Sequence, residues 1–418
     1  MENNKSFSKA FYLILLLFFI FGFITWVNGV LVPYLKLACE LNDWQAYLVT
    51  TAFYLPYPIM AIPSSYVLQY IGYKKGMSLG MFILAIGSLL FLPAAYSRSF
   101  ELFLVGLFIQ GTGLSLLQTA ANPYVTIVGP IESAAQRISI MGIGNKIAGI
   151  LGSIILGNLI LSNADELRDT LKQLTGADKI ALLNDVALRV VHPYILLSIS
   201  LILLSLFLWW VSLPEPEMEA SANESDNSFT ALFPYTYLWL GFISLFLYVG
   251  AEVIAGDTIA TYATEGWNIP LDTSKSFTSL TLTAMLAGYF MGVILIPNFL
   301  SQQQLLAISS IAGILLTFGI IFLQGIYSVA CVALLGAANA IVWPAIWPLA
   351  IAGLKQLTPK GSALLIMGIA GGALLPLAYG WLSSDDMLGK QNAYIILLPC
   401  YLFILFYATK GYRIGKQS

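Results

Sequence analysis

Charged residues are scarce in this chain, and their scarcity excludes a water-soluble globular protein. Of 418 residues only 10% are charged, whereas 58% are hydrophobic. A soluble domain carries about 25% charged residues, which it needs to cover its surface. The formal net charge of -2 also lacks the positive excess of a nucleic-acid-binding protein, so we expect no nucleic acid partner.

Cysteine and histidine are rare as well. Cys39, Cys331 and Cys400 are odd in number and far apart in the sequence, which argues against a disulfide framework and a zinc site. We expect three thiols that face lipid or the protein core. The only histidine, His192, precedes Pro193 at the start of a hydrophobic segment. There a loop or capping role is favoured over a proton relay, and no cofactor is predicted.

Long hydrophobic segments recur over the whole chain. About 20 mostly apolar residues are needed to cross about 30 Å of hydrocarbon. Polar, glycine and proline positions separate twelve segments of this kind. The predicted spans are 10–35, 45–71, 76–95, 101–127, 138–161, 192–213, 235–264, 276–299, 303–324, 327–354, 361–382 and 391–409. The first is too long for a signal peptide and lacks a cleavage pattern, so we expect it to be retained. The sequence thus predicts an all-α membrane protein with twelve transmembrane helices.

Two connections between the predicted spans are longer than a turn. Residues 162–191 contain DELRDTLKQL, which predicts a short helix outside the membrane. Residues 212–229 are acidic, contain proline and have few apolar side chains, which is typical of a linker. We therefore predict a six-helix bundle over 1–213, a cytoplasmic linker over 214–234 and a second six-helix bundle over 235–418.

A short internal repeat supports two related halves. The tetrapeptide IMGI at 140–143 recurs at 366–369, and the Asn-Pro pair at 122–123 corresponds to the Trp-Pro pair at 347–348. The IMGI match joins the fifth predicted span to the eleventh, and the proline match joins the fourth to the tenth. Each match therefore connects equivalent spans of two six-span halves. Duplicated six-span halves are a known plan of transporters, in which the substrate binds between the halves near the midplane.

The positions of Lys and Arg predict the orientation in the membrane. Cytoplasmic loops are enriched in these residues, and ten of them fall on the side of the two termini, against four in the short loops of the other side. The ten are Lys5, Lys9, Lys74, Lys75, Arg137, Lys355, Lys360, Lys410, Arg413 and Lys416; the four are Lys36, Arg98, Lys275 and Lys390. We expect both termini in the cytoplasm, a bacterial inner membrane as the location, and a monomer, because two fused halves can enclose a path.

Three charged residues lie inside predicted spans, where charges are costly and face the protein interior or water. Glu252 is the first candidate for cation coupling, because a buried carboxylate can take up a proton or hold Na⁺ as a metal ligand. Asp257 is a second candidate, about 140° further around the same helix. Lys146 is the third, and Glu252 could instead serve only to neutralise it. Because Lys146 is placed about 10 Å closer to the cytoplasm, a direct pair is not expected.

Neutral polar and aromatic side chains in the spans could bind a sugar. Amides both donate and accept hydrogen bonds, as sugar hydroxyls do, and tryptophan can stack on the apolar face of a pyranose. The candidate substrate-binding residues are Asn28, Gln118, Asn122, Asn145, Asn339, Trp26, Trp343 and Trp347. Gln118 and Asn122 share one helix face at i, i+4 spacing. The alternative is hydrogen bonding between helices for the amides and a membrane-interface position for the tryptophans.

Several of these segments resemble one transporter family. QTAANPYVTIVGP at 118–130 resembles the signature of the fucose permease and glucose/galactose transporter family, within the major facilitator superfamily. The similarity extends to FITWVNGVLVPYLK, YVGAEV, WPAIWPLAIAGL and GSALLIMGIAGGALLPL, and it covers essentially the whole chain. It implies the major facilitator fold of two six-helix bundles, a central sugar cavity and alternating access.

Departures from the family pattern narrow the expected substrate. The fucose permease has acids where this chain has Gly29 and Gln118, and those acids are linked with proton-coupled fucose transport. YVGAEV, which contains Glu252, is more similar to the glucose/galactose branch, in which some members use sodium. The resemblance therefore implies import of a hexose such as glucose, galactose or mannose, with Na⁺ or H⁺ as the coupling ion.

Other functions remain open at the level of sequence. A facilitative uniporter or a sugar sensor that does not transport would share most of these features. A membrane-embedded enzyme acting on lipid-linked sugars would need acids or histidines gathered at one membrane face, and no such catalytic spacing occurs. We therefore predict a transporter and not an enzyme.

Overall fold

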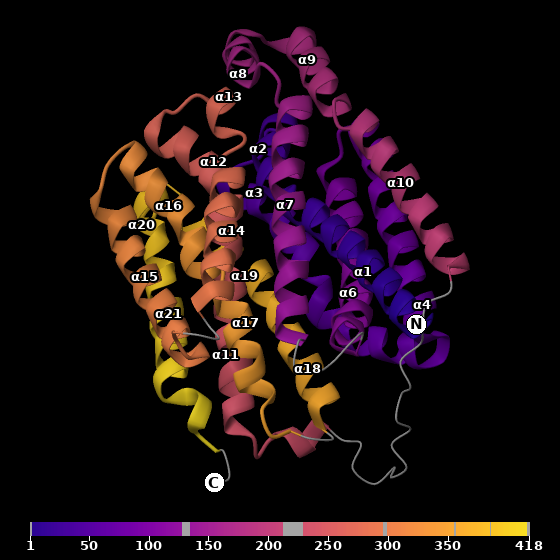
Figure 1. The fold of residues 1–418 in the computed structure, drawn as a ribbon. Coiled ribbons are helices and arrows are strands. Elements are labelled where there is room, and N and C mark those ends of the chain that lie inside the picture. The colour runs from indigo at the N-terminus through magenta and orange to yellow at the C-terminus, as the bar shows by residue number, and fades with distance from the viewer. Residues whose placement is uncertain are drawn as a thin grey trace.

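Helices make up every regular element of the described chain, which confirms the all-α class (Figure 1). The computed structural model describes residues 2–127, 134–211, 229–295, 299–354, 357–384 and 386–415. Within these ranges, ten helical segments are long and apolar enough to cross a membrane. Helices also occupy the two other predicted spans: α3 and the first part of α4 cover 45–71, and α14 lies within 276–299.

The helices of the first half run from indigo to magenta in Figure 1. They are α1 (Glu2–Trp26), α2 (Asn28–Ala38), α3 (Asp43–Tyr54), α4 (Pro56–Leu89), α5 (Phe91–Ser97), α6 (Phe100–Ile127), α7 (Ala134–Ile160), α8 (Ala164–Gln173), α9 (Gly176–Leu188) and α10 (Val191–Trp210). Helix α4 joins two predicted spans, and Gly72 (φ 80°, ψ 168°) interrupts it where the sequence predicts a turn.

The second half contains α11 (Thr236–Asp257), α12 (Ile259–Thr261), α13 (Leu271–Ser274), α14 (Thr278–Leu295), α15 (Gln302–Phe322), α16 (Ile326–Asn339), α17 (Val342–Ile351), α18 (Thr358–Met367), α19 (Gly371–Leu382), α20 (Gly389–Asn392) and α21 (Leu397–Thr409). Short helical turns lie at η3 (Phe229–Leu232), η4 (Tyr262–Gly266), η6 (Gly368–Ala370), η7 (Ala393–Ile396) and η8 (Gly411–Arg413). Most of the predicted linker over 214–234 falls in 212–228, outside the described residues.

Packing within each half is extensive, and a smaller set of helices joins the halves. In the first half α4 packs on α6 and α10, and α1 on α7; in the second, α14 packs on α16, and α15 on α16 and α21. Across the halves, α7 packs on α14 and α3 on α19. Helix α11 also packs on α2 of the first half, so side chains of α3, α7 and α11 lie near the contact between the halves.

Helices α1 and α7 approach each other closely at Gly22. A Cβ at this position would overlap with the backbone carbonyl of Asn145 on α7. Glycine allows such close backbone approach because it has no side chain. This contact fixes the end of α1 that contains Trp26 against the part of α7 that contains Asn145 and Lys146.

The segment between α7 and α10 forms two short helices at one end of the molecule. The predicted helix in DELRDTLKQL is confirmed as α8, and α9 follows it. Both lie at the upper end of Figure 1, opposite the C-terminus. We call this the α8–α9 end. The short helix α13 of the second half lies beside α8 there.

Candidate functional site

A salt bridge connects the two halves between α7 and α11. The Lys146 ammonium lies 2.9 Å from Glu252 Oε1, and the side chains are only 7% and 13% exposed. The expectation that these residues do not pair is thus wrong. It was derived from axial positions on regular helices and ignored the long, flexible lysine stem, which extends the reach of the ammonium well beyond its own helical turn.

Trp26 supplies a second contact for the Lys146 charge. The ammonium lies 4.1 Å from the centre of the Trp26 ring, a distance at which a cation is attracted to an indole face. Trp26 Nε1 donates a hydrogen bond to Asn145 Oδ1 (3.2 Å), and Asn145 Nδ2 donates to the Phe18 carbonyl (3.3 Å). Trp26 and Asn145, both predicted sugar-binding residues, therefore hold α1 to α7 and position Lys146 in this conformation.

Asp257 makes a separate contact between the halves. Its carboxyl group is buried (1% exposed), and Oδ2 accepts a hydrogen bond from the Thr50 hydroxyl of α3 at 3.0 Å. The other oxygen, Oδ1, has no hydrogen-bond partner among the described residues. Glu252 and Asp257 thus contact different helices of the first half, as their rotation around α11 predicts.

The predicted pair on α6 is only partly visible. Gln118 Nε2 donates a hydrogen bond to the Tyr57 hydroxyl at 2.9 Å, and the Tyr57 ring stacks near Tyr54 with ring centres 6.1 Å apart. The side chains of Asn122 and Asn28 lie outside the described residues. The shared face of Gln118 and Asn122, and the sugar-binding role of Asn28, stay predictions.

The second half contributes an amide and a group of aromatic rings. Asn339 is fully buried; its Oδ1 accepts from the Tyr401 hydroxyl (3.0 Å), and its Nδ2 has no partner among the described residues. Trp343 and Trp347 stack with ring centres 5.4 Å apart, and Tyr248 lies 6.4 Å from Trp343. Because Tyr248 is one turn before Glu252 on α11, these rings extend toward the Lys146–Glu252 pair.

Sequence reasoning missed three hydroxyl-bearing residues at these positions. Thr50 contacts Asp257, Tyr57 contacts Gln118, and Tyr248 connects Trp343 with the Glu252 turn. Helical spacing could have identified Tyr248, since it precedes Glu252 by four residues. Nothing in the sequence places Thr50 or Tyr57 near residues that are far away along the chain.

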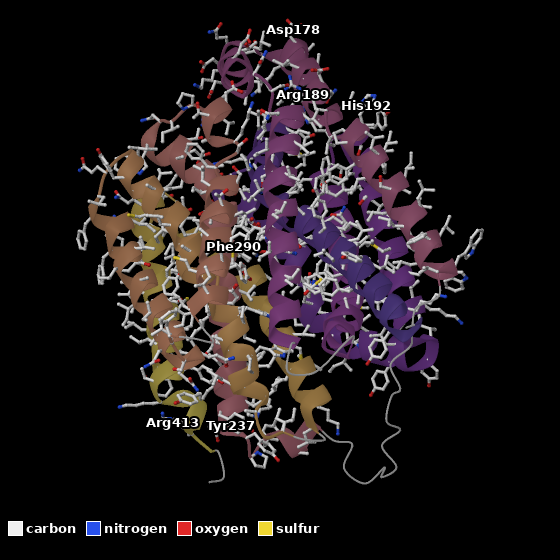
Figure 2. The ribbon with its side chains drawn as sticks, in the orientation of Figure 1. Asp178, Arg189, His192, Tyr237, Phe290 and Arg413 are labelled. Carbon is white, nitrogen blue, oxygen red and sulfur yellow. The ribbon has the colours of Figure 1, made fainter. Side chains whose placement is uncertain are left out.

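Two other expectations concern groups outside this region. His192 is exposed at the start of α10, near the α8–α9 end (Figure 2). Cys39, Cys331 and Cys400 are free thiols. No group of three or more His, Cys, Asp or Glu side chains that could hold a metal ion occurs in the described part of the chain.

The arrangement brings together an ion pair across the halves, a buried carboxyl group, and amides and rings suited to hydroxylated ligands. Carboxyl groups exchange protons or bind cations, and amides bind hydroxyl groups in either direction. A change in the contact between α7 and α11 would alter both the Lys146–Glu252 pair and the packing of Trp26. A ligand bound to these side chains would therefore act on the relative position of the halves.

Comparison with known proteins agrees with this architecture. The model of the Major Facilitator Superfamily matches residues 14–376. A glucose/galactose transporter of Brucella abortus is 32% identical over 422 residues, covering 98% of this chain and 96% of that protein. An L-fucose-proton symporter of Escherichia coli is 30% identical over 415 residues, covering 97% and 94%.

Solved structures give the same result. A fucose transporter of this superfamily, crystallised in the outward conformation, has a TM-score of 0.78 and 29% identity, covering 99% of this chain and 100% of that one. A proton:xylose symporter is similar in fold, with a TM-score of 0.70 and 14% identity, covering 97% and 95%. The resemblance drawn from span four and its neighbours is confirmed. The chain is a multi-pass membrane protein that belongs to the Major Facilitator Superfamily, a family of transporters.

Proposed function

We propose that this protein imports a hexose together with a cation, by alternating access of a central site to the two sides of the membrane. The observation that supports it most directly is the buried Lys146–Glu252 pair, which crosses the contact between the halves. The similarity to glucose/galactose transporters and L-fucose-proton symporters supports a sugar as the solute. Glucose, galactose and mannose are the favoured candidates.

Glu252 is the proposed coupling residue. A proton or Na⁺ bound to its carboxylate neutralises the charge that attracts Lys146, and so changes the energy of the contact between α7 and α11. A proton needs one carboxylate oxygen, whereas Na⁺ needs further oxygen ligands and must compete with the ammonium. The proposed coupling ion is therefore H⁺ or Na⁺, and Asp257 is the second candidate acid on the same helix.

Sugar binding is assigned to side chains from both halves. The amides of Asn28, Gln118, Asn122, Asn145 and Asn339 offer donors and acceptors, and Trp26, Trp343 and Trp347 offer stacking faces. Sugar and cation together would favour the occluded state more than either alone, which is how one gradient drives the other. Asn145 and Trp26 must exchange their mutual hydrogen bond for contacts with the sugar.

Fucose is a less favoured substrate because two acids of the fucose permease are missing. A side chain at Gly29 would overlap with the Thr278 hydroxyl on α14, so the packing here opposes an acid at this position. Gln118 hydrogen-bonds to Tyr57 but cannot take up a proton as an acid would. The chemistry of proton coupling must therefore involve other residues if H⁺ is the ion.

The proposed setting is a bacterial inner membrane, with the protein as a monomer and both termini in the cytoplasm. The excess of Lys and Arg on the side of the termini supports this orientation. The α8–α9 end then faces the outside.

Uptake of labelled hexose into proteoliposomes tests the proposal. We expect accumulation above the outside concentration under an imposed Na⁺ gradient or an imposed pH gradient, and competition by glucose, galactose or mannose more than by fucose. Empty liposomes and vesicles with a dissipated gradient are the controls. Equilibration without accumulation would indicate a uniporter, and sugar binding without uptake would indicate a sensor.

A further inference from the structure

Helices α8 and α13 both begin without a cap from their own chain neighbours. The first amides of a helix have no partner within the helix and need an acceptor from outside. Before α8, Asn163 has left-handed backbone geometry (φ 55°), and its side chain makes no capping hydrogen bond. Before α13, Pro270 has no side chain that could accept one. Each start therefore depends on a group from elsewhere.

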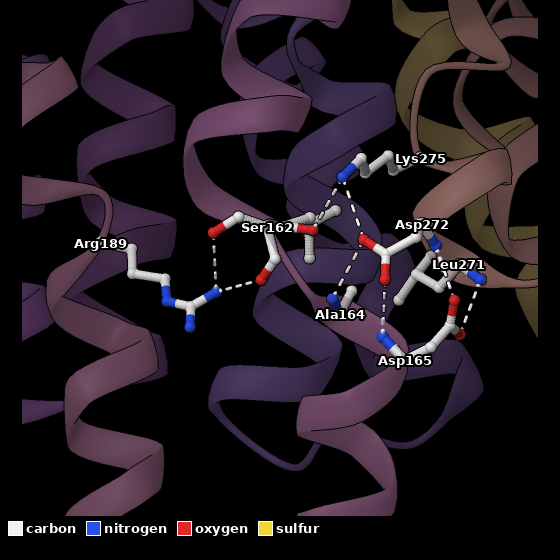
Figure 3. A network of polar contacts seen from close by, with 8 residues as sticks. Ser162, Ala164, Asp165, Arg189, Leu271, Asp272 and Lys275 are labelled. Atoms are coloured by element: carbon white, nitrogen blue, oxygen red, sulfur yellow. Dashed lines mark hydrogen bonds and ion pairs between the residues drawn. The ribbon is translucent and has the colours of Figure 1, made fainter.

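Each helix receives its cap from the other one (Figure 3). The Asp165 carboxylate accepts hydrogen bonds from the backbone amides of Leu271 (2.8 Å) and Asp272 (2.9 Å). The Asp272 carboxylate accepts from the amides of Ala164 (3.2 Å) and Asp165 (3.3 Å). Two aspartates, more than a hundred residues apart in sequence, thus exchange caps across the two halves.

Lys275 strengthens the same contact. Its ammonium donates to Asp272 Oδ1 (3.0 Å) and to the Leu161 carbonyl (3.2 Å), so it links the second half to the end of α7. On the other side of the turn, Arg189 donates to the Ser162 carbonyl at 2.7 Å (Figure 3). The turn that precedes α8 is therefore held from both sides.

These contacts exist only while the halves meet at the α8–α9 end. Moving the ends apart removes the acceptors of four amides and the Leu161 carbonyl that accepts from Lys275 at the same time, so the loss is cooperative. A similar transporter of the Major Facilitator Superfamily was crystallised in the outward conformation. This supports a state of the fold in which the halves are apart at one end.

We propose that α8 and α13 form a latch that holds the α8–α9 end closed, with Asp165 and Asp272 as positioning residues that set how often it opens. The proposal rests on the alternating access proposed above, but on neither the solute nor the ion. It gives the 162–191 segment a role in transport, as the element that must release before substrate can enter from that side.

Amide hydrogen exchange of the full-length protein in lipid nanodiscs tests the latch. Asp165→Ala should speed exchange, after correction for intrinsic rates, by about fivefold at 271–272 and also at the start of α8, because opening exposes both. Asp272→Ala should have the same reciprocal effect. Asp169→Ala is the matched control, since Asp169 lies on α8 and, within the part of the chain that the structure describes, forms an ion pair only with exposed Lys172. Faster exchange confined to the amides that the removed aspartate caps would overturn the proposal.

Chemical labelling from outside gives a second measurement. Thr278 is fully buried near the start of α14, against the first half. With the three natural cysteines replaced, Thr278→Cys should react with a membrane-impermeant maleimide about fivefold faster when Asp165→Ala is present, and at the parent rate with Asp169→Ala. Equal labelling rates for Thr278→Cys alone, with Asp165→Ala and with Asp169→Ala would reject the latch. Because neither measurement requires uptake, the latch can stand even if hexose symport fails.

Discussion

The Lys146–Glu252 pair is the residue-scale feature on which the functional proposal depends. Two opposite charges are removed from water here, and such a pair is tolerated only with good geometry and further partners. The 2.9 Å contact and the Trp26 face provide both. Because the two residues belong to different halves, any ligand that binds to or displaces one of them acts on the contact between the halves.

Replacing Glu252 with Gln tests this coupling. The variant keeps the shape of the side chain but cannot ionise, so we expect concentrative hexose uptake to be lost while sugar exchange at equal concentrations continues. Gradient-driven and exchange uptake would be measured in the same proteoliposomes. The double variant Glu252→Gln with Lys146→Gln controls for the unpaired lysine that the single change leaves buried. Full concentrative uptake by Glu252→Gln would reject the assignment.

At the scale of helices, close approaches between backbones decide where side chains meet. The contact of α1 with α7 at Gly22 brings Trp26 to Asn145 and Lys146, and the exchanged caps bring α8 to α13. Neither contact follows from the hydrophobic pattern of the helices concerned. Both follow from small or acidic residues at single positions.

Gly22→Ala tests the first of these contacts. The added methyl group would overlap with the Asn145 carbonyl and separate the helices, at a cost of about 1–3 kcal/mol in the free energy of unfolding. Thermal unfolding in detergent, followed by tryptophan fluorescence, should show a lower midpoint. Gly157→Ala is the control, because a Cβ there would make only ordinary contacts, the nearest at 3.4 Å. Equal unfolding midpoints for Gly22→Ala and the parent protein would contradict the close approach of α1 and α7.

The contact between α8 and α13 should depend on pH through the Asp272 carboxylate. Partial burial raises the pKa of Asp272, but hydrogen bonds from Lys275 and from the amides of Ala164 and Asp165 outweigh it, so the pKa is lowered. Because the pKa of Asp272 is lower in the folded protein than in the unfolded chain, its carboxylate stabilises the folded state. This contribution is fully present above the unfolded pKa of about 3.9 and is lost as the pH falls through the folded pKa.

Hydrogen exchange at the start of α8 checks this expectation. Corrected rates should be equal between pH 8 and pH 5 and should rise only below about pH 4, where Asp272 becomes protonated. The Asp272→Ala variant should lose this rise. A transition near neutral pH would mean that another group controls the contact.

At the scale of the whole molecule, alternating access requires that the loaded protein reorient as a unit. We therefore expect counterflow: vesicles preloaded with unlabelled hexose should take up labelled hexose faster than empty ones, without any ion gradient. A channel or a sensor has no step that would produce this acceleration. Identical initial rates in loaded and empty vesicles would contradict the proposed mechanism, and a non-competing sugar inside is the control.

The hydrophobic pattern and a few motifs predicted the fold class, and the structure and the comparisons confirm it. Long apolar segments specify helices in a membrane because unpaired backbone groups are too costly there. DELRDTLKQL likewise predicted a short helix, which is α8. QTAANPYVTIVGP indicated the family, which the match over 14–376 confirms. The rare charged residues in spans, Lys146, Glu252 and Asp257, were also recognisable one by one.

Only the tertiary structure decided which of these residues meet. The Lys146–Glu252 pair contradicted a prediction made from axial positions, because side-chain reach and helix packing are not encoded in the helical period. Thr50 beside Asp257, and the caps exchanged by Asp165 and Asp272, are contacts between segments more than a hundred residues apart. Sequence determines local propensity and burial, whereas such partners are chosen by the packing of two halves against each other.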